Sequence, residues 1–156
     1  LPLIEHAGLS RSDAERLARV KLALAGLPSH AARLYPSELS GGMVKRAALA
    51  RALALDPEVL FLDEPTAALD LRHQELVLRN ARQLRDFGAC VVIVLHDLNL
   101  AAAYSDRVIM MADGHIVADG TPEEVFTAER IEEVYRQPVV VTSHPTRDCP
   151  LILSTD

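Results

Sequence analysis

Two short apolar runs, separated by a stretch of helical periodicity, constrain the fold of this chain more than any other feature. Val59–Leu62 and Cys90–Leu95 are continuously apolar and of strand length, and Leu71–Asp86 between them has apolar residues at helical spacing. A strand, a helix and a second strand of this kind form a right-handed βαβ unit with a parallel sheet. Because the runs are apolar throughout, we expect both strands to be buried on both faces, and Cys90 to be a buried residue.

Two helices are predicted before the first strand. Ser12–Glu15 has the pattern of a capping box, and Gly26 is placed to end the helix that it opens. A second helix, rich in alanine and leucine, is predicted over Met43–Leu55, and Asp56 with the following proline ends it. The expected apolar face of the first helix consists of Leu17, Val20 and Leu24, and the expected exposed basic residues of the second are Lys45, Arg46 and Arg51.

The C-terminal third should combine short helices with antiparallel strands. A helix is predicted over Leu98–Tyr104, and two apolar segments flank Asp113-Gly114, which is a strong signal of a β-hairpin. Short helices are expected over residues 122–136, where a threonine and a proline open a capping box. Two apolar runs at residues 139–141 and 151–153 are expected to pair.

Composition excludes some classes of function. With 156 residues and 49% hydrophobic residues the chain can bury a core, and a net charge of −6 argues against non-specific nucleic-acid binding, which needs a basic surface. No apolar segment reaches the roughly 20 residues that cross a bilayer, and no basic region followed by an apolar stretch opens the chain. Its two cysteines form no framework, so a reducing, cytoplasmic setting is the simplest interpretation.

A glycine-rich helix start supplies the first candidate site. Ser40-Gly41-Gly42 stands directly before the second predicted helix. Two glycines let a ligand approach the backbone closely, and the unpaired N–H groups and partial positive charge of a helix N-terminus suit a phosphate. The same pattern is typical of an ordinary N-cap, which remains the alternative.

A pair of carboxylates follows the first apolar run. Asp63 and Glu64 would stand at the carboxyl end of a parallel strand, where ligands of α/β proteins bind. There Asp63 can hold Mg²⁺, and Glu64 can orient an attacking water. Two acidic residues in a turn are the alternative.

His96 follows the second apolar run, and we expect it beside Glu64 on the same edge of the sheet. Its imidazole could form a hydrogen bond to a phosphate oxygen or to the attacking water. A structural or solvated histidine is the alternative.

In their order, these segments resemble the ATPases of ABC transporters. Leu39–Gly42 is similar to the signature motif of that family, Val59–Glu64 to the Walker B strand, Ala67–Asp70 to the D-loop and His96 to the switch histidine. The resemblance covers nearly the whole chain. Further matches after the signature are Arg46, Ala50, Arg51 and Ala52.

The resemblance implies a fold and a division into domains. The fold class is α/β: a partial P-loop NTPase-like ABC ATPase fold, with a parallel sheet and flanking helices, together with part of the helical subdomain. Residues 1–56 would form the helical subdomain with the signature, 57–120 the core α/β subdomain, and 121–156 the C-terminal helices and tail.

The resemblance also implies ligands, roles and partners. The ligands are ATP and Mg²⁺, with Glu64 and His96 catalytic and Asp63 at the metal. The partners are a second ATPase subunit in a sandwich dimer and a transmembrane permease, which would hold the protein at the cytoplasmic face of the inner (plasma) membrane; no nucleic acid is expected. The implied nucleotide-binding residues are Ser40, Gly41, Gly42 and Asp70.

Two family motifs are absent from these residues. There is no G-x-x-x-x-G-K-[ST], because the only lysines are Lys21 and Lys45 and neither follows a glycine, and no glutamine precedes the signature. We therefore expect the chain to begin inside the helical subdomain, just past the Q-loop, and to be inactive alone.

The subfamily resemblance changes along the chain. Residues 1 to about 70, especially 36–62, resemble ATPases of lipid-asymmetry (phospholipid) importers. The chain from Leu71 onward, notably residues 95–101 and 143–145, resembles ATPases of haem and iron-complex importers. The expected function is the ATPase subunit of an importer of haem or iron complexes. The alternatives are a phospholipid transporter ATPase, a non-transport ABC protein and a non-catalytic remnant.

Overall fold

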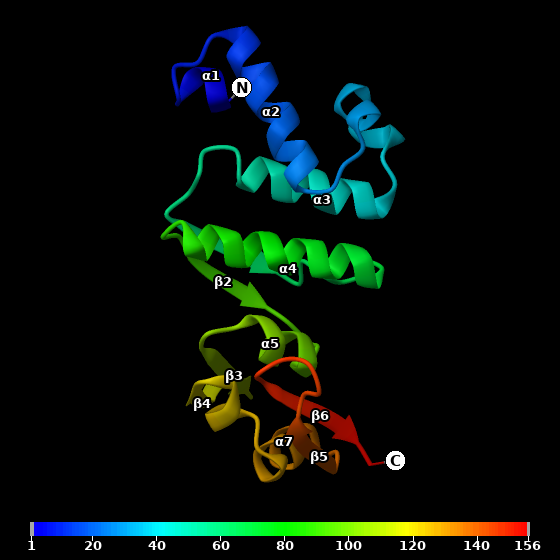
Figure 1. Ribbon diagram of the computed structural model, residues 1–156, viewed down its shortest axis with the longest axis vertical. Helices are drawn as coiled ribbons and strands as arrows, with labels where there is room; N and C mark the ends of the chain where they lie inside the picture. Colours follow the sequence, from blue (N-terminus) through cyan, green and yellow to red (C-terminus); the bar gives the residue numbers. More distant parts are fainter. Residues whose placement is uncertain (1, 156) are drawn as a thin grey trace. The chain divides into compact units, whose positions relative to one another are not determined.

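The chain divides into two compact units, Leu1–Val94 and Leu95–Asp156, of which the computed structural model describes residues 2–155 (Figure 1). The finer division predicted above, into residues 1–56, 57–120 and 121–156, stays a prediction. None of the described helices has the length and apolarity that a bilayer crossing requires. The elements of the first unit are the helices α1 (Pro2–Glu5), α2 (Arg11–Leu24), η1 (Ser29–Arg33), η2 (Pro36–Glu38), α3 (Gly41–Ala52) and α4 (Leu71–Asp86), and the strands β1 (Val59–Asp63) and β2 (Cys90–Val94).

The predicted βαβ unit is confirmed. β1 and β2 pair in parallel, in a register that joins Val59 to Cys90 and Asp63 to Val94, and α4 connects them. Leu60 of β1 and Val77 of α4 are buried in one core cluster. That cluster also contains Ala25, Leu49, Ala50 and Leu53.

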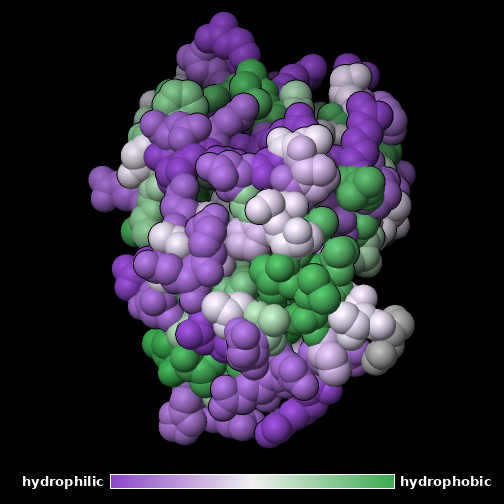
Figure 2. Space-filling model, turned by 60° about the horizontal axis from the view of Figure 1, so that its bottom comes forward, coloured by the Kyte–Doolittle hydropathy of each residue, from purple (hydrophilic) through white to green (hydrophobic). Residues whose placement is uncertain are grey.

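The expectation that both strands are buried on both faces is wrong. Alternate residues face away from the core, so that Phe61 is 73% exposed and Val92 is 42% exposed. Cys90, expected to be buried, is exposed for the same reason. Among the described residues the sheet has only two strands, and the core cluster lies on one of its faces. On the molecular face in Figure 2, hydrophobic residues likewise reach the surface among hydrophilic ones.

α2 starts and packs differently from the prediction. Its N-cap is Ser10 rather than Ser12, because the Ser10 hydroxyl accepts a hydrogen bond from the Asp13 N–H at 3.2 Å. Val20 and Leu24, predicted on the apolar face, are about half exposed, and the buried face carries Ala14 and Lys21 instead. The buried face of α2 therefore consists of a small side chain and the aliphatic stem of Lys21, and the Lys21 ammonium pairs with Asp56. Gly26, at a φ of 76°, ends the helix as predicted.

The second unit contains the predicted hairpins. β3 and β4 pair antiparallel around Asp113 and Gly114, whose φ values of 49° and 77° suit a two-residue turn. β5 and β6 also pair antiparallel, as predicted for the two apolar runs of the tail. The elements of this unit are α5 (Leu98–Tyr104), β3 (Val108–Ala112), β4 (His115–Gly120), α6 (Pro122–Val125), α7 (Ala128–Tyr135), β5 (Val139–Ser143) and β6 (Pro150–Ser154).

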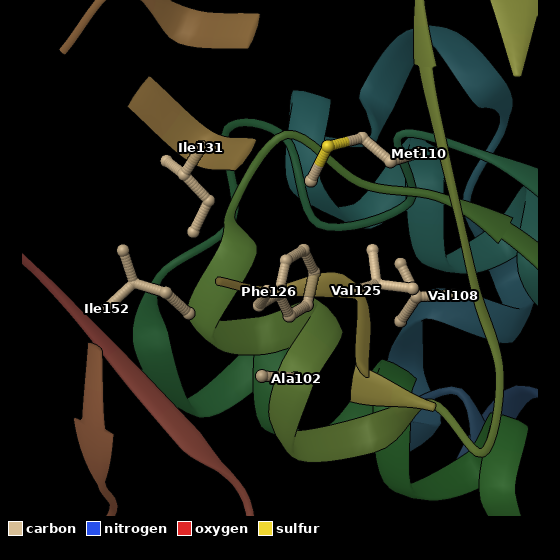
Figure 3. Close-up of a cluster of buried hydrophobic side chains, with 7 residues drawn as sticks. All are labelled: Ala102, Val108, Met110, Val125, Phe126, Ile131 and Ile152. Atoms are coloured by element: carbon tan, nitrogen blue, oxygen red, sulfur yellow. The ribbon is translucent and has the colours of Figure 1, made fainter. Parts of the chain in front are cut away.

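A separate hydrophobic core holds the second unit together (Figure 3). Its largest side chain, Phe126, is only 2% exposed, and it lies between Ala102 of α5 and residues of the two hairpins. Helix α5, the element that follows His96 in the chain, is therefore held in place by the core of this unit. The cluster consists of Ala102, Val108, Met110, Val125, Phe126, Ile131 and Ile152.

Candidate functional site

Ser40 is the N-cap of α3, which begins at Gly41, two residues before the predicted start at Met43. Its hydroxyl oxygen accepts a hydrogen bond from the Met43 N–H at 3.3 Å, and its carbonyl accepts the first intrahelical bond, from the Val44 N–H at 2.9 Å. The side chain therefore is an N-cap, but its O–H hydrogen can still be donated to a ligand. The first N–H groups of the helix have no partner within the helix. The helix start can thus bind an anion while Ser40 caps it.

The two glycines of this turn are not required by the packing of the chain itself. A Cβ at Gly41 would meet no atom within 4 Å, and one at Gly42 would meet only Leu69 Cδ2, at an ordinary 3.7 Å. Neither residue has a positive φ. The absence of side chains here leaves the backbone N–H groups accessible to a ligand.

Asp63 and Glu64 lie at the carboxyl end of β1, as predicted. Both residues are exposed, and Asp63 is the last residue paired with β2. The Glu64 N–H donates to the Val94 carbonyl at 3.2 Å, which carries the sheet pairing one residue further. Glu64 then turns away with a φ of 44°, a left-handed conformation that non-glycine residues rarely adopt.

Asp70 is the N-cap of α4. Its Oδ1 accepts a hydrogen bond from the His73 N–H at 2.9 Å and lies 2.7 Å from His73 Nδ1. These contacts, first the backbone N–H and then the imidazole, lower the pKa of the Asp70 carboxyl below its ordinary value. Asp70 is therefore ionised at neutral pH.

The structure places the helix of Ser40 next to the carboxylates of β1. Lys45 of α3 donates a hydrogen bond from Nζ to the Ala67 carbonyl at 2.6 Å, which ties the helix to the turn after Glu64. A cavity of about 270 Å³ lies between these elements. Its lining includes Lys45, Leu49, Phe61, Asp63, Glu64 and Leu69.

Arg46 is half-buried, which corrects the prediction that it is exposed. Its Nη1 donates to the Gly26 carbonyl at 2.7 Å and its Nε to the Gly42 carbonyl at 3.2 Å. The guanidinium therefore joins α3 to the end of α2. Helical periodicity did not reveal this role, because the acceptors are backbone carbonyls, which leave no side-chain signal in the sequence.

His96 belongs to the second unit, whereas Glu64 belongs to the first. His96 is exposed and stands directly before Asp97, the N-cap of α5, whose Oδ1 accepts from the Asn99 and Leu100 N–H groups at 2.9 and 3.0 Å. The expected juxtaposition of His96 with Glu64 stays a prediction.

The carboxylates of Asp63 and Glu64 can hold Mg²⁺ only if other ligands complete its coordination. Within residues 2–155 no group of three or more His, Cys, Asp or Glu side chains could hold a metal ion. Mg²⁺ commonly uses one or two carboxylates together with waters and substrate phosphates, however. The exposed Asp63 suits that role beside a nucleotide.

A parallel strand that ends in adjacent carboxylates, next to a glycine-rich helix start, is characteristic of α/β proteins that bind nucleotides. The family model "ABC transporter" matches residues 7–67. The haemin import ATP-binding protein HmuV of Vibrio cholerae is 51% identical over 92% of this chain and 58% of its own length. HmuV of Streptomyces coelicolor is 51% identical over 94% of this chain and 52% of its own.

A solved structure agrees with these matches. The ATP-binding cassette MJ0796, as a dimer in a post-hydrolysis state with ADP and Pi, has a TM-score of 0.71 and 34% identity over 78% of this chain and 53% of its own. The chain belongs to the family of ABC transporter ATPases. It spans only a little over half the length of the curated relatives named above.

Proposed function

We propose that this chain is part of the ATP-hydrolysing subunit of an ABC importer of haem or iron complexes. The observation that carries the proposal is the pair of exposed carboxylates, Asp63 and Glu64, at the end of a parallel strand in the same unit as the Ser40 helix start. The relatives named for haemin import support the substrate class. Their alignments extend over more than nine tenths of this chain, including the region that resembles phospholipid transporters.

Each residue has a chemical role in the proposal. The Glu64 carboxylate accepts a proton from the attacking water or orients it. Asp63 holds Mg²⁺, which offsets negative charge on the phosphates when it is bound. Ser40, with the N–H groups of Gly41 and Gly42, donates hydrogen bonds to the γ-phosphate. His96 donates a hydrogen bond at the same phosphate, and Asp70 is a further nucleotide-binding residue.

These roles require a partner. In the proposed sandwich dimer, the signature of one subunit faces the Walker A and Walker B segments of the other. The pair would drive a transmembrane permease and would lie at the cytoplasmic face of the inner membrane. A chain with Ser40 but no G-x-x-x-x-G-K-[ST] can complete only the site whose phosphate loop comes from the partner.

The first test is the chain alone. We expect no Mg²⁺-dependent ATP hydrolysis by the purified 156-residue chain, because these residues include no G-x-x-x-x-G-K-[ST] segment to cradle the β- and γ-phosphates. Turnover that Glu64→Gln abolishes would contradict this prediction.

The second test is a mixed dimer with a full-length relative. Ser40→Arg in this chain should silence the complete site by placing bulk where the phosphate approaches, whereas Glu64→Gln should leave the rate unchanged. Ser12→Arg, on the exposed part of α2, is the matched control. The reverse pattern would refute the assignment of the motifs to opposite sites.

The third test addresses the substrate class. The dimer is reconstituted with its permease in vesicles, and we expect ATP-driven uptake of haem rather than transfer of phospholipid.

A further inference from the structure

Asn99, in the first turn of α5, binds the backbone of β6 with both ends of its side-chain amide. Its Nδ2 donates to the Ile152 carbonyl at 3.0 Å, and its Oδ1 accepts from the Ile152 N–H at 2.8 Å. Because the backbone N–H can only donate and the carbonyl can only accept, the orientation of the amide is determined. A neighbouring strand would satisfy Ile152 in the same way.

The same turn of α5 is held from a second side. The Asp97 carboxylate accepts hydrogen bonds from the backbone N–H groups of Asn99 and Leu100. The side chains of Ala102 and Ile152 also lie in one core cluster (Figure 3). The Asp97 cap orders the first turn of α5, while the two Asn99 hydrogen bonds (the Asn99 clasp) and the core contact connect that turn to β6.

His96 immediately precedes this fixed turn. Only Asp97 and Leu98 separate it from Asn99, so we expect the hydrogen bonds between Asn99 and Ile152 to restrict where the backbone of His96 can lie. Asparagine is well suited to this position: aspartate would lose the donor, and leucine, although of similar size, would leave both Ile152 groups without these partners.

We propose that Asn99 is a positioning residue for His96, and that the C-terminal hairpin β5–β6 thereby determines where this histidine lies. The functional consequence rests on the proposed function, in which His96 donates a hydrogen bond to a phosphate. The placement itself needs no nucleotide. The C-terminal hairpin then supports His96 within the second unit, although it carries none of the proposed catalytic residues.

The experiment compares Asn99→Ala with the unmodified chain by NMR at one fixed pH. The probes are the imidazole Cε1–H signals of His96, His115 and His144, and hydrogen exchange of the Ile152 amide. The matched control is Gln137→Ala, which removes a 3.3 Å hydrogen bond to Ser154 on β6. We expect Asn99→Ala to shift the His96 signal and to speed Ile152 exchange about tenfold, while His115 stays in place. Gln137→Ala should leave His96 unshifted.

Several results would overturn the proposal. In the first, Asn99→Ala speeds exchange of the Ile152 amide but leaves the His96 signal unshifted. In the second, Asn99→Ala shifts the signals of His96, His115 and His144 equally, which indicates that Asn99 has a purely structural role. If Asn99→Ala unfolds the unit, Asn99→Asp takes its place: it keeps an acceptor for the Ile152 N–H, loses the donor to the Ile152 carbonyl, and should still shift the His96 signal relative to the unmodified chain. Unfolding of both variants would make the clasp a general folding requirement and would also overturn the specific role. No nucleotide is added, so failure of the ATPase experiments does not affect this outcome.

Discussion

Replacing Arg46 tests whether the stability of α3, the helix capped by Ser40, depends on the hydrogen bond from Arg46 to the end of α2. In Arg46→Met the apolar stem remains, but the Gly26 and Gly42 carbonyls lose donors at 2.7 and 3.2 Å. A net hydrogen bond to a charged group contributes about 1.5–3 kcal/mol. The Gly42 contact is longer, lies within one helix and is partly solvated, so its loss adds little. We therefore expect the first unit to lose about 2 kcal/mol of unfolding free energy.

The measurement is urea denaturation followed by far-ultraviolet circular dichroism, with hydrogen exchange of α2 and α3 to assign the effect to the first unit. Arg51→Met, on the exposed side of the same helix, is the matched control and should change stability by less than about 0.5 kcal/mol. Arg46→Lys should recover only part of the loss, because an ammonium lacks the forked donor geometry. If Arg46→Met and Arg51→Met have equal stabilities, the tie contributes nothing and the reasoning fails.

Three further predictions concern the core, an ion pair and the signature. Phe126→Ala should destabilise the second unit by about 3–5 kcal/mol in thermal or urea unfolding, whereas Phe87→Ala, at a residue 89% exposed, should have almost no effect. Hydrogen bonds from Arg107, at 2.7 Å to each carboxylate oxygen, lower the pKa of Asp119, so this contribution to stability is complete above the unfolded-state pKa of about 4 and is lost as the pH falls through the folded-state pKa. Arg107→Gln should raise the pKa of Asp119 toward its ordinary value in a carbon-13 NMR titration; an unchanged pKa would contradict the stated cause. Gly41→Ala should leave the unfolding free energy unchanged or slightly raised, because the added Cβ meets nothing, yet it should reduce ATPase activity of the mixed dimer; full activity would show that this glycine is not needed at the phosphate.

Local patterns in the sequence predicted most of the elements. The βαβ unit, the turn at Asp113 and the pairing of the two tail runs depend on short-range signals, namely period, turn chemistry and apolar runs, and the structure confirms each of them. The positions of Ser40 and Asp63 at the ends of their elements were predicted for the same reason.

Properties that depend on distant partners were predicted less well. The apolarity of a strand does not reveal whether a second layer covers it, so the exposure of Phe61 and Cys90 was missed. Arg46 was assigned to the surface because its acceptor, the Gly26 carbonyl, lies 20 residues away in the chain. The hydrogen bonds between Asn99 and Ile152 join residues 53 apart in the chain, so they were missed for the same reason.

The left-handed backbone at Glu64 also limits how this position can change in evolution. A φ of 44° costs a β-branched residue of order 1–2 kcal/mol, but costs glycine nothing and asparagine little. Under the proposed function, a lineage that loses hydrolysis at this site is therefore free to replace the carboxylate by glycine or asparagine, whereas valine or isoleucine must also distort the turn. In inactive relatives, the residue at the position of Glu64 should therefore be one that tolerates a left-handed backbone, whether or not it resembles a carboxylate.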